Sequence, residues 1–164
     1  MSYADIQESL GSIISNIEGV SKVLFARPAA LTDAQFKELF TEPSSADPSR
    51  HKVNVWFLEW LGATPSRRDA PTNTYFVAHR FGLTGYLGFT PTSNVTMNDL
   101  AETVMDTLTS HIRSGIDPAR GINVEDTIAS IDALGQDQLG PTLCSFVTMT
   151  ISVLERRQVA SWAD

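Results

Sequence analysis

The sequence predicts an α+β domain, with one mostly antiparallel sheet, a long β-hairpin and two main helices packed on one face. Two observations carry this prediction. Residues 52–61 and 73–89 are rich in β-branched and aromatic side chains, and the short polar segment 62–72 joins them. Apolar residues recur with helical spacing in 3–17 and in 97–112. The expected order is helix, strand, hairpin, helix and a final pair of strands.

The amino-terminal helix is predicted over 3–17, where the apolar residues follow the spacing i, i+4, i+7, i+8, i+11. Gly19 is a natural helix stop, and a short strand over 20–26 follows it. Residues 28–50 are interpreted as an insertion. Thr32 or Asp33 is expected to cap a short helix there, with Phe36, Leu39 and Phe40 on one side.

The hairpin is unusually long and apolar on both faces. Its first strand alternates Val53, Val55 and Phe57 with Trp56, Leu58 and Trp60, so neither face is polar throughout. At about 3.3 Å per residue the second strand reaches roughly 55 Å, so the ribbon is expected to bend or to project from the domain. The two tryptophans need a cover, which is either a helix or another subunit.

The second half of the chain begins with the clearest helical stripe, over 97–112, for which Thr96 is the expected N-cap. A weak strand over 127–134, a turn over 135–141 and a well-alternating strand over 143–155 follow. The apolar face of this last strand is expected to lie beneath the 97–112 helix.

Composition is that of one globular domain spanning 1–164, with 158–164 as a short tail. The hydrophobic fraction is 42% and the formal net charge is −7, which does not fit a freely acting nucleic-acid binder. The single cysteine, Cys144, lies in an apolar run and is expected to be a buried free thiol. No apolar run is long enough for a membrane span, so we expect no membrane association.

Residues typical of catalysis or metal binding do not form a recognisable motif. His51, His79 and His111 are far apart and lack partners at ligand spacing. His79 lies on the apolar face of a strand, where a hydrogen-bonded core or interface histidine is expected. We therefore expect no catalytic, cofactor-binding or metal site, no cofactor, and no enzymatic activity.

Arg67 and Arg68 form the one local basic feature, at the expected tip of the hairpin. One interpretation is a solubilising loop. The other is a contact with an acidic partner surface or with DNA phosphate.

The chain resembles the tail terminator (tail completion) and neck proteins of long-tailed bacteriophages. The resemblance rests on the segment IEGVSKV at 17–23, the long hairpin, the helix NDLAETVMDTLTSHI at 98–112 and the final strand TMTISVLERRQ at 148–158. It extends over most of 5–157. The 28–50 stretch departs from it, because that stretch is longer than the family pattern leads us to expect.

The resemblance implies a structural virion protein, made in the host cytoplasm, that assembles with itself as a hexameric ring. Such a ring caps the tail tube protein, ends tube polymerisation and joins the tail to the head connector or stopper protein. DNA passes through its acidic lumen without specific binding. The resemblance also implies a subunit interface at the second hairpin face, through Trp56, Leu58, Trp60 and Phe76, and a partner contact at Arg67 and Arg68.

Two alternatives stay open. One is another head–tail connector, neck or tail-tube-like protein. The other belongs to a different class, a small α+β domain that binds a ligand or regulates another protein.

Overall fold

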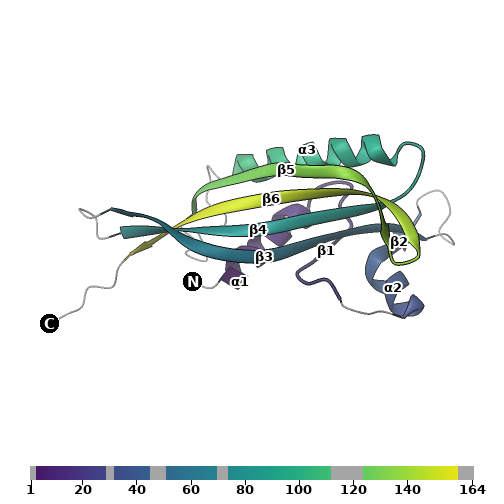
Figure 1. The fold of residues 1–164 in the computed structure, drawn as a ribbon, viewed down its shortest axis with the longest axis horizontal. Helices are drawn as coiled ribbons and strands as arrows, with labels where there is room; N and C mark the ends of the chain where they lie inside the picture. The colour runs from purple at the N-terminus through teal and green to yellow at the C-terminus, as the bar shows by residue number, and fades with distance from the viewer. Residues whose placement is uncertain (1–2, 29–31, 45–50, 70–73, 112–123, 159–164) are drawn as a thin grey trace.

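The computed structural model describes residues 3–28, 32–44, 51–69, 74–111 and 124–158, and at 66–69, 111, 124–126 and 158 it describes the backbone alone. It confirms the α+β class: a mixed sheet of six strands is packed with three helices (Figure 1). The elements are α1 (Tyr3–Ser15), β1 (Lys22–Leu24), α2 (Asp33–Phe40), β2 (Thr41–Pro43), β3 (His51–Asp69), β4 (Thr74–Gly88), α3 (Ser93–His111), β5 (Val124–Leu139) and β6 (Thr142–Gln158).

The sheet has the strand order β1-β3-β4-β6-β5, and β2 pairs with β3 off this path. The β3–β4, β4–β6 and β5–β6 pairs are antiparallel, and β1 runs parallel to β3. The prediction of a mostly antiparallel sheet is therefore confirmed, with β1 as the parallel exception. β6 lies between β4 and β5, so the two hairpins of the chain share one sheet.

The first hairpin is longer than predicted, because most of the 62–72 segment is strand and not loop. β3 continues to Asp69 through register shifts between Trp60 and Gly62 and between Pro65 and Arg67. Gly62 has a φ of 131°, which a residue without a Cβ adopts at little cost. Pro65 lies beside a bulge, where its missing N–H is tolerated. The remaining residues of the predicted loop, 70–73, lie outside the described part.

α1 and α3 cover one face of the sheet, and α2 is a third helix beside the two main helices that were expected. The helical spacing of α1 is confirmed, because Ile6, Leu10 and Ile14 are fully buried. They share a core with residues of α3 and with the inward residues of the central strands. That core contains Trp56, Leu58, Phe81, Leu83, Val104, Leu108, Val147, Met149, Ile151 and Val153. The prediction that the 97–112 helix, now α3, covers the apolar face of β6 is therefore also confirmed.

α2 packs against the opposite face, at one end of the sheet only. Thr32 is its N-cap, and Thr32 and Gln35 form a reciprocal capping box. Phe40 is buried in a second core with Val55 and Phe57 of β3. The short helix predicted inside the 28–50 insertion is thus confirmed. β2 then pairs with the start of β3, which ties this part of the insertion to the sheet.

Three predicted boundaries are wrong. α3 begins at Ser93, so Thr96 lies inside the helix, where its hydroxyl donates to the Thr92 carbonyl. β5 extends well beyond 127–134 at both ends. The turn before β6 is confined to Gly140 and Pro141, because Gly140 has a φ of 58° and reverses the chain at once.

Two glycines of β4 provide a test of this packing. A Cβ at Gly85 would lie 2.7 Å from the indole of Trp56, whereas a Cβ at Gly82 would lie 3.4 Å from the flexible Leu61 side chain. Overpacking a rigid core ring costs about 1–3 kcal/mol. We expect Gly85→Ala to lower the free energy of unfolding by this amount in urea titrations.

Gly82→Ala is the matched control, and we expect it to change stability by less than about 0.5 kcal/mol. Equal losses in the two variants would contradict the placement of Trp56 against Gly85.

Candidate assembly surface

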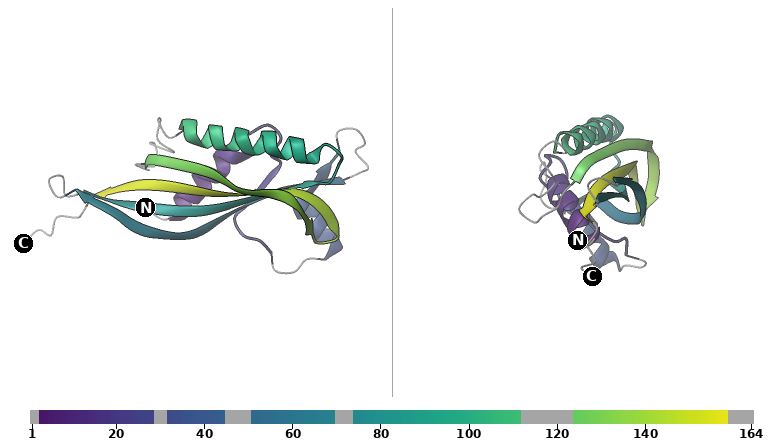
Figure 2. Two further views of the ribbon diagram at one scale, coloured as in Figure 1. Left: turned by 45° about the horizontal axis from the view of Figure 1, so that its top comes forward. Right: turned by 90° about the vertical axis from the view of Figure 1, so that its left-hand side faces the viewer.

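One end of the sheet extends past the helices as a projecting arm, which we define as residues 62–69 of β3, 74–80 of β4 and 152–158 of β6. Figure 1 shows these three strands continuing beyond the ends of α1 and α3, and Figure 2 shows the same projection after a rotation. At about 3.3 Å per residue, the 19 residues of β3 span about 60 Å. The hairpin therefore projects from the domain, which is one of the two outcomes expected from its length, the other being a bend.

The four residues of the hypothetical hairpin interface differ in burial and in what they contact. Trp56 and Leu58 are fully buried and belong to the core beneath α1 and α3. Helices of the same chain therefore cover them, and the hypothesis that a second subunit contacts them is corrected. Trp60 is 40% exposed at the edge of the sheet and stacks on Tyr3 of α1, with ring centroids 4.3 Å apart. Phe76 is half-buried on the arm.

Beyond α2, the second face of the sheet has no helix of the described chain over it. Cross-strand register places Gly62, Arg80, Ser152 and Ile128 in one row on this face, which we call the uncovered face. Leu61 and Ile128 are exposed by 57% and 61% there. Arg80 and Ser152 separate these two apolar side chains, so the face is a mixed apolar and polar surface that the described helices leave open.

The sheet also has two long open edges, on opposite sides. Among the described residues, β5 pairs only with β6, so its second edge is open from Val124 to Leu139. The second edge of β3 pairs with β2 and β1 only as far as Phe57. Gln7 then donates to the carbonyl of Leu58 at 2.6 Å, and beyond it no described strand pairs with this edge. Unpaired edges of this length are sites for association with another chain.

Arg67 and Arg68 lie at the far end of the arm, where their backbone pairs with Phe76 and Tyr75 of β4. They are therefore strand residues and not part of a tip loop, and their side chains lie outside the described part. Arg80, Arg156 and Arg157 are on the same arm. The arm thus carries five arginines and only two acidic residues, Asp69 and Glu155.

A buried ion network holds the arm strands together. Nε2 of His79 on β4 lies 2.7 Å from Oε2 of Glu155 on β6, and Arg157 donates to the same oxygen at 2.8 Å. His79 and Glu155 are exposed by only 3% and 1%. Burial alone raises the pKa of Glu155, but the hydrogen bonds from Arg157 and His79 outweigh it and bring the pKa below its ordinary value. The expectation of a hydrogen-bonded buried His79 is confirmed.

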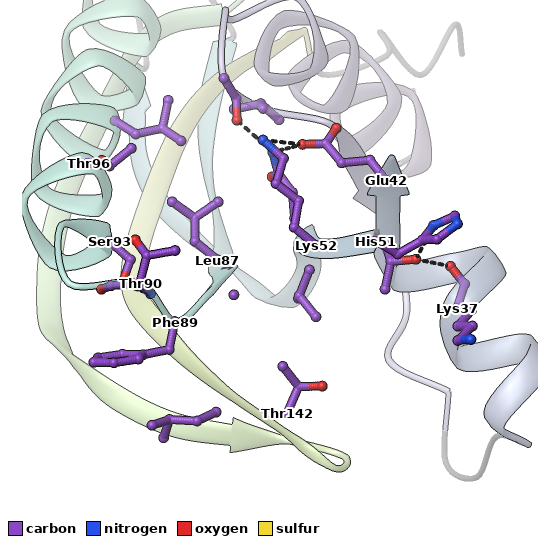
Figure 3. Close-up of a pocket in the computed structure, with 18 of the residues that line it drawn as sticks. Lys37, Glu42, His51, Lys52, Leu87, Phe89, Thr90, Ser93, Thr96 and Thr142 are labelled. Atoms are coloured by element: carbon purple, nitrogen blue, oxygen red, sulfur yellow. Dashed lines mark hydrogen bonds and ion pairs between the residues drawn. The ribbon is translucent and has the colours of Figure 1, made fainter. Parts of the chain in front are cut away.

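The opposite end of the molecule contains a groove of about 1170 Å³. The start of α3 lines one side of the groove, and α2, β2 and the start of β3 line the other (Figure 3). On the second of these sides Lys52 and Glu42 form an ion pair of 3.2 Å, and Asn54 donates to the same carboxylate at 3.1 Å. Burial raises the pKa of Glu42, but hydrogen bonds from Ser21, Asn54 and Lys52 together lower it below its ordinary value.

The remaining candidates for chemistry lie apart from one another. Cys144 is a buried free thiol, as expected, and burial raises its pKa to about 11. His51 lies at the groove, where its Nδ1 is 3.2 Å from the hydroxyl of Thr41, and the side chain of His111 lies outside the described part. The described residues contain no cluster of three or more metal-ligating side chains. Within the same residues, no helix is long and apolar enough to cross a lipid bilayer.

No family model matches this chain, and no curated protein matches it.

Sequence analysis missed that the fold brings two acidic segments together. α3 and β5 pack against each other, and between them they carry seven acidic residues and no Lys or Arg. The signal was present in the sequence as two segments without cations, 93–111 and 124–139. Asp99, Glu102 and Asp106 are exposed on α3, whereas Asp132 of β5 accepts a hydrogen bond from Thr150 on the face of the sheet opposite α3.

The ion network predicts a pH-dependent stability. Because the pKa of Glu155 is lowered below 4.5 on folding, the carboxylate stabilises the fold above about pH 4.5, and this contribution is lost as the pH falls through the lowered pKa. We expect Glu155→Gln to cost about 2 kcal/mol at pH 7, the size of a hydrogen bond to a charged group.

Urea unfolding at pH 7 and pH 3 measures this effect, and the difference between wild type and variant should shrink at pH 3. Glu59→Gln, at an exposed carboxylate of β3, is the control and should leave stability unchanged at both pH values. A penalty for Glu155→Gln of the same size at pH 3 would mean that the carboxylate charge is not the cause.

Proposed function

We propose that this protein is a structural virion component that assembles with itself as a ring at the head-proximal end of a phage tail. The observation that carries the proposal is the pair of open edges on opposite sides of one sheet, β5 on one side and β3 beyond Leu58 on the other. The exposed Leu61 and Ile128 on the uncovered face support it.

The two open edges differ in sequence and in position, so a contact between them is heterologous. A heterologous contact joins one surface of a subunit to a different surface of the next, and it produces a ring when the rotation closes. A two-fold dimer uses one surface twice and would leave one kind of edge open in both subunits. Ring formation satisfies both edges of every subunit at once.

The assignment to a tail terminator rests on the resemblance in the sequence, through the segment 17–23, the long hairpin, the 98–112 helix and the 148–158 strand. In this role the ring ends polymerisation of the tail tube protein and provides the docking surface for the head connector. DNA passes through its lumen, and the net charge of −7 disfavours adhesion of the phosphates to the wall.

The assembly itself is directly testable. At micromolar concentration and low ionic strength we expect native mass spectrometry to give a single closed oligomer, with six copies as the family resemblance implies. Electron microscopy of the same sample should give rings. A monomer under all of these conditions would overturn the proposal.

A charge on the uncovered face should weaken the ring and leave the fold intact. Leu61→Lys and Ile128→Lys change exposed side chains, so each should shift the thermal unfolding midpoint by only a few degrees. We expect each to raise the concentration needed for half-assembly by at least tenfold in analytical ultracentrifugation. Val95→Lys, on an exposed residue of α3, is the control and should assemble normally. Normal assembly of both sheet variants would exclude this face from the ring.

The groove favours a second candidate function, a ligand-binding domain. Its volume of about 1170 Å³ is slightly above the usual range for small-molecule sites, and its lining is more polar than is usual for them. Mass spectrometry of the extract from natively purified, then denatured, protein distinguishes this candidate. A compound released at a one-to-one ratio supports it, and an extract without one contradicts it.

A further inference from the structure

Three exposed aromatic side chains gather where β3 loses its neighbouring strand. Tyr3, Phe25 and Trp60 are each exposed by 40% or more. β1 pairs with β3 only as far as Phe57, and Phe25 is the first residue after β1. Trp60 comes shortly afterwards on β3, where it stacks on Tyr3 of α1. We call Tyr3, Phe25 and Trp60 the aromatic seam, because they lie along the junction of α1 with the edge of β3.

One stripe of α1 holds the aromatic seam in place. Tyr3, Gln7 and Gly11 are spaced four residues apart, so they lie on one side of the helix. Gln7 donates to the carbonyls of Leu58 and Phe25 at 2.6 and 3.5 Å. A Cβ at Gly11 would lie only 2.5 Å from the ring of Phe25, so this ring packs directly on the helix. Ordered tyrosine and tryptophan rings lose little entropy on binding, and they are enriched at the hot spots of protein interfaces.

We infer that the aromatic seam of one copy receives the edge of β5 from the next copy, with Leu134 packed against the stacked rings of Tyr3 and Trp60. The inference rests on the proposed ring and names the side chains at its subunit contact. Leu134 is exposed, although its cross-strand partner Val147 is fully buried beneath the helices. The partner of Trp60, Phe81, is buried in the same core. Leu134 and Trp60 therefore lie on the helix-covered side of the sheet, at its opposite edges.

The strand directions fit this contact. Successive neighbours in the order β3-β4-β6-β5 are antiparallel, so β5 runs opposite to β3. When the sheets of two copies join edge to edge in the same orientation, β5 of one copy lies antiparallel to β3 of the other. Charge disfavours the alternative in which two β5 edges meet, because β5 carries four acidic residues and no Lys or Arg.

The room left on the edge of β3 brings Leu134 close to the aromatic seam. β1 and the side chain of Gln7 occupy this edge as far as Leu58, so an added strand starts at Glu59. An antiparallel β5 has its C-terminal end there, and Leu134 lies in that part of β5. The bulge of β3 after Trp60 interrupts a regular backbone ladder, so side chains provide much of the contact.

Crosslinking between two singly substituted proteins tests the inference. Tyr3→Cys and Leu134→Cys are placed on separate chains, which are coexpressed and then treated with a short bis-maleimide. The native Cys144 does not compete, because it is buried and its pKa is raised to about 11. We expect covalent dimers from the coexpressed pair and none from either substituted protein alone, since a heterologous contact brings two different surfaces together.

Charges at the same two positions measure the contribution of the contact to assembly. We expect Tyr3→Lys and Leu134→Lys each to raise the concentration needed for half-assembly at least tenfold in analytical ultracentrifugation. Phe89→Lys and Leu143→Lys are the matched controls and should assemble normally. These two apolar residues are exposed by 45% and 42%, against 45% and 44% for Tyr3 and Leu134, and they line the groove instead. Circular dichroism of each variant verifies that the fold is kept.

The possible results separate the two claims. A wild-type monomer overturns the proposed ring together with this inference. A wild-type ring in which the coexpressed cysteine proteins do not crosslink, or in which both lysine variants at the contact assemble normally, overturns this inference and leaves the ring in place. Crosslinking of either cysteine protein with itself indicates a two-fold contact and also overturns it. An equal loss of assembly in the two control variants does the same, because it shows a general effect of added charge.

Discussion

The fold depends on the double burial of β3. Between Val53 and Leu58 its side chains alternate between two cores: Trp56 and Leu58 pack beneath α1 and α3, and Val55 and Phe57 pack against α2. Strands buried on both faces read as continuous apolar runs, which is why this stretch lacks a polar face. Arg27 completes the second core by lying 5.6 Å from the ring centre of Phe57. Trp60 still stacks on Tyr3 of α1, and from Gly62 onwards the same strand enters the arm, beyond α1 and α2.

The arm therefore needs a source of order other than helices. The buried carboxylate of Glu155 provides one, because it accepts hydrogen bonds from His79 across the β4–β6 pair and from Arg157 on its own strand. A buried charge is costly unless it is paired and hydrogen-bonded, so the network favours one register of these strands over a slipped one. The arm thus continues beyond the helices, with Arg80 exposed on the uncovered face.

Short sequence patterns predicted the elements that depend on residue spacing and on capping within a single helix. The spacing of Ile6, Leu10 and Ile14 identified α1, and Thr32 identified the start of α2. The length of the hairpin could not be predicted, because Gly62 and Pro65 are turn residues in most contexts and become bulge residues only when β4 lies opposite. Whether Trp56 is buried within its own chain depends on which helix lies over it, and that is tertiary information. The closeness of the two acidic segments was missed for the same reason, since the packing of α3 on β5 is tertiary information.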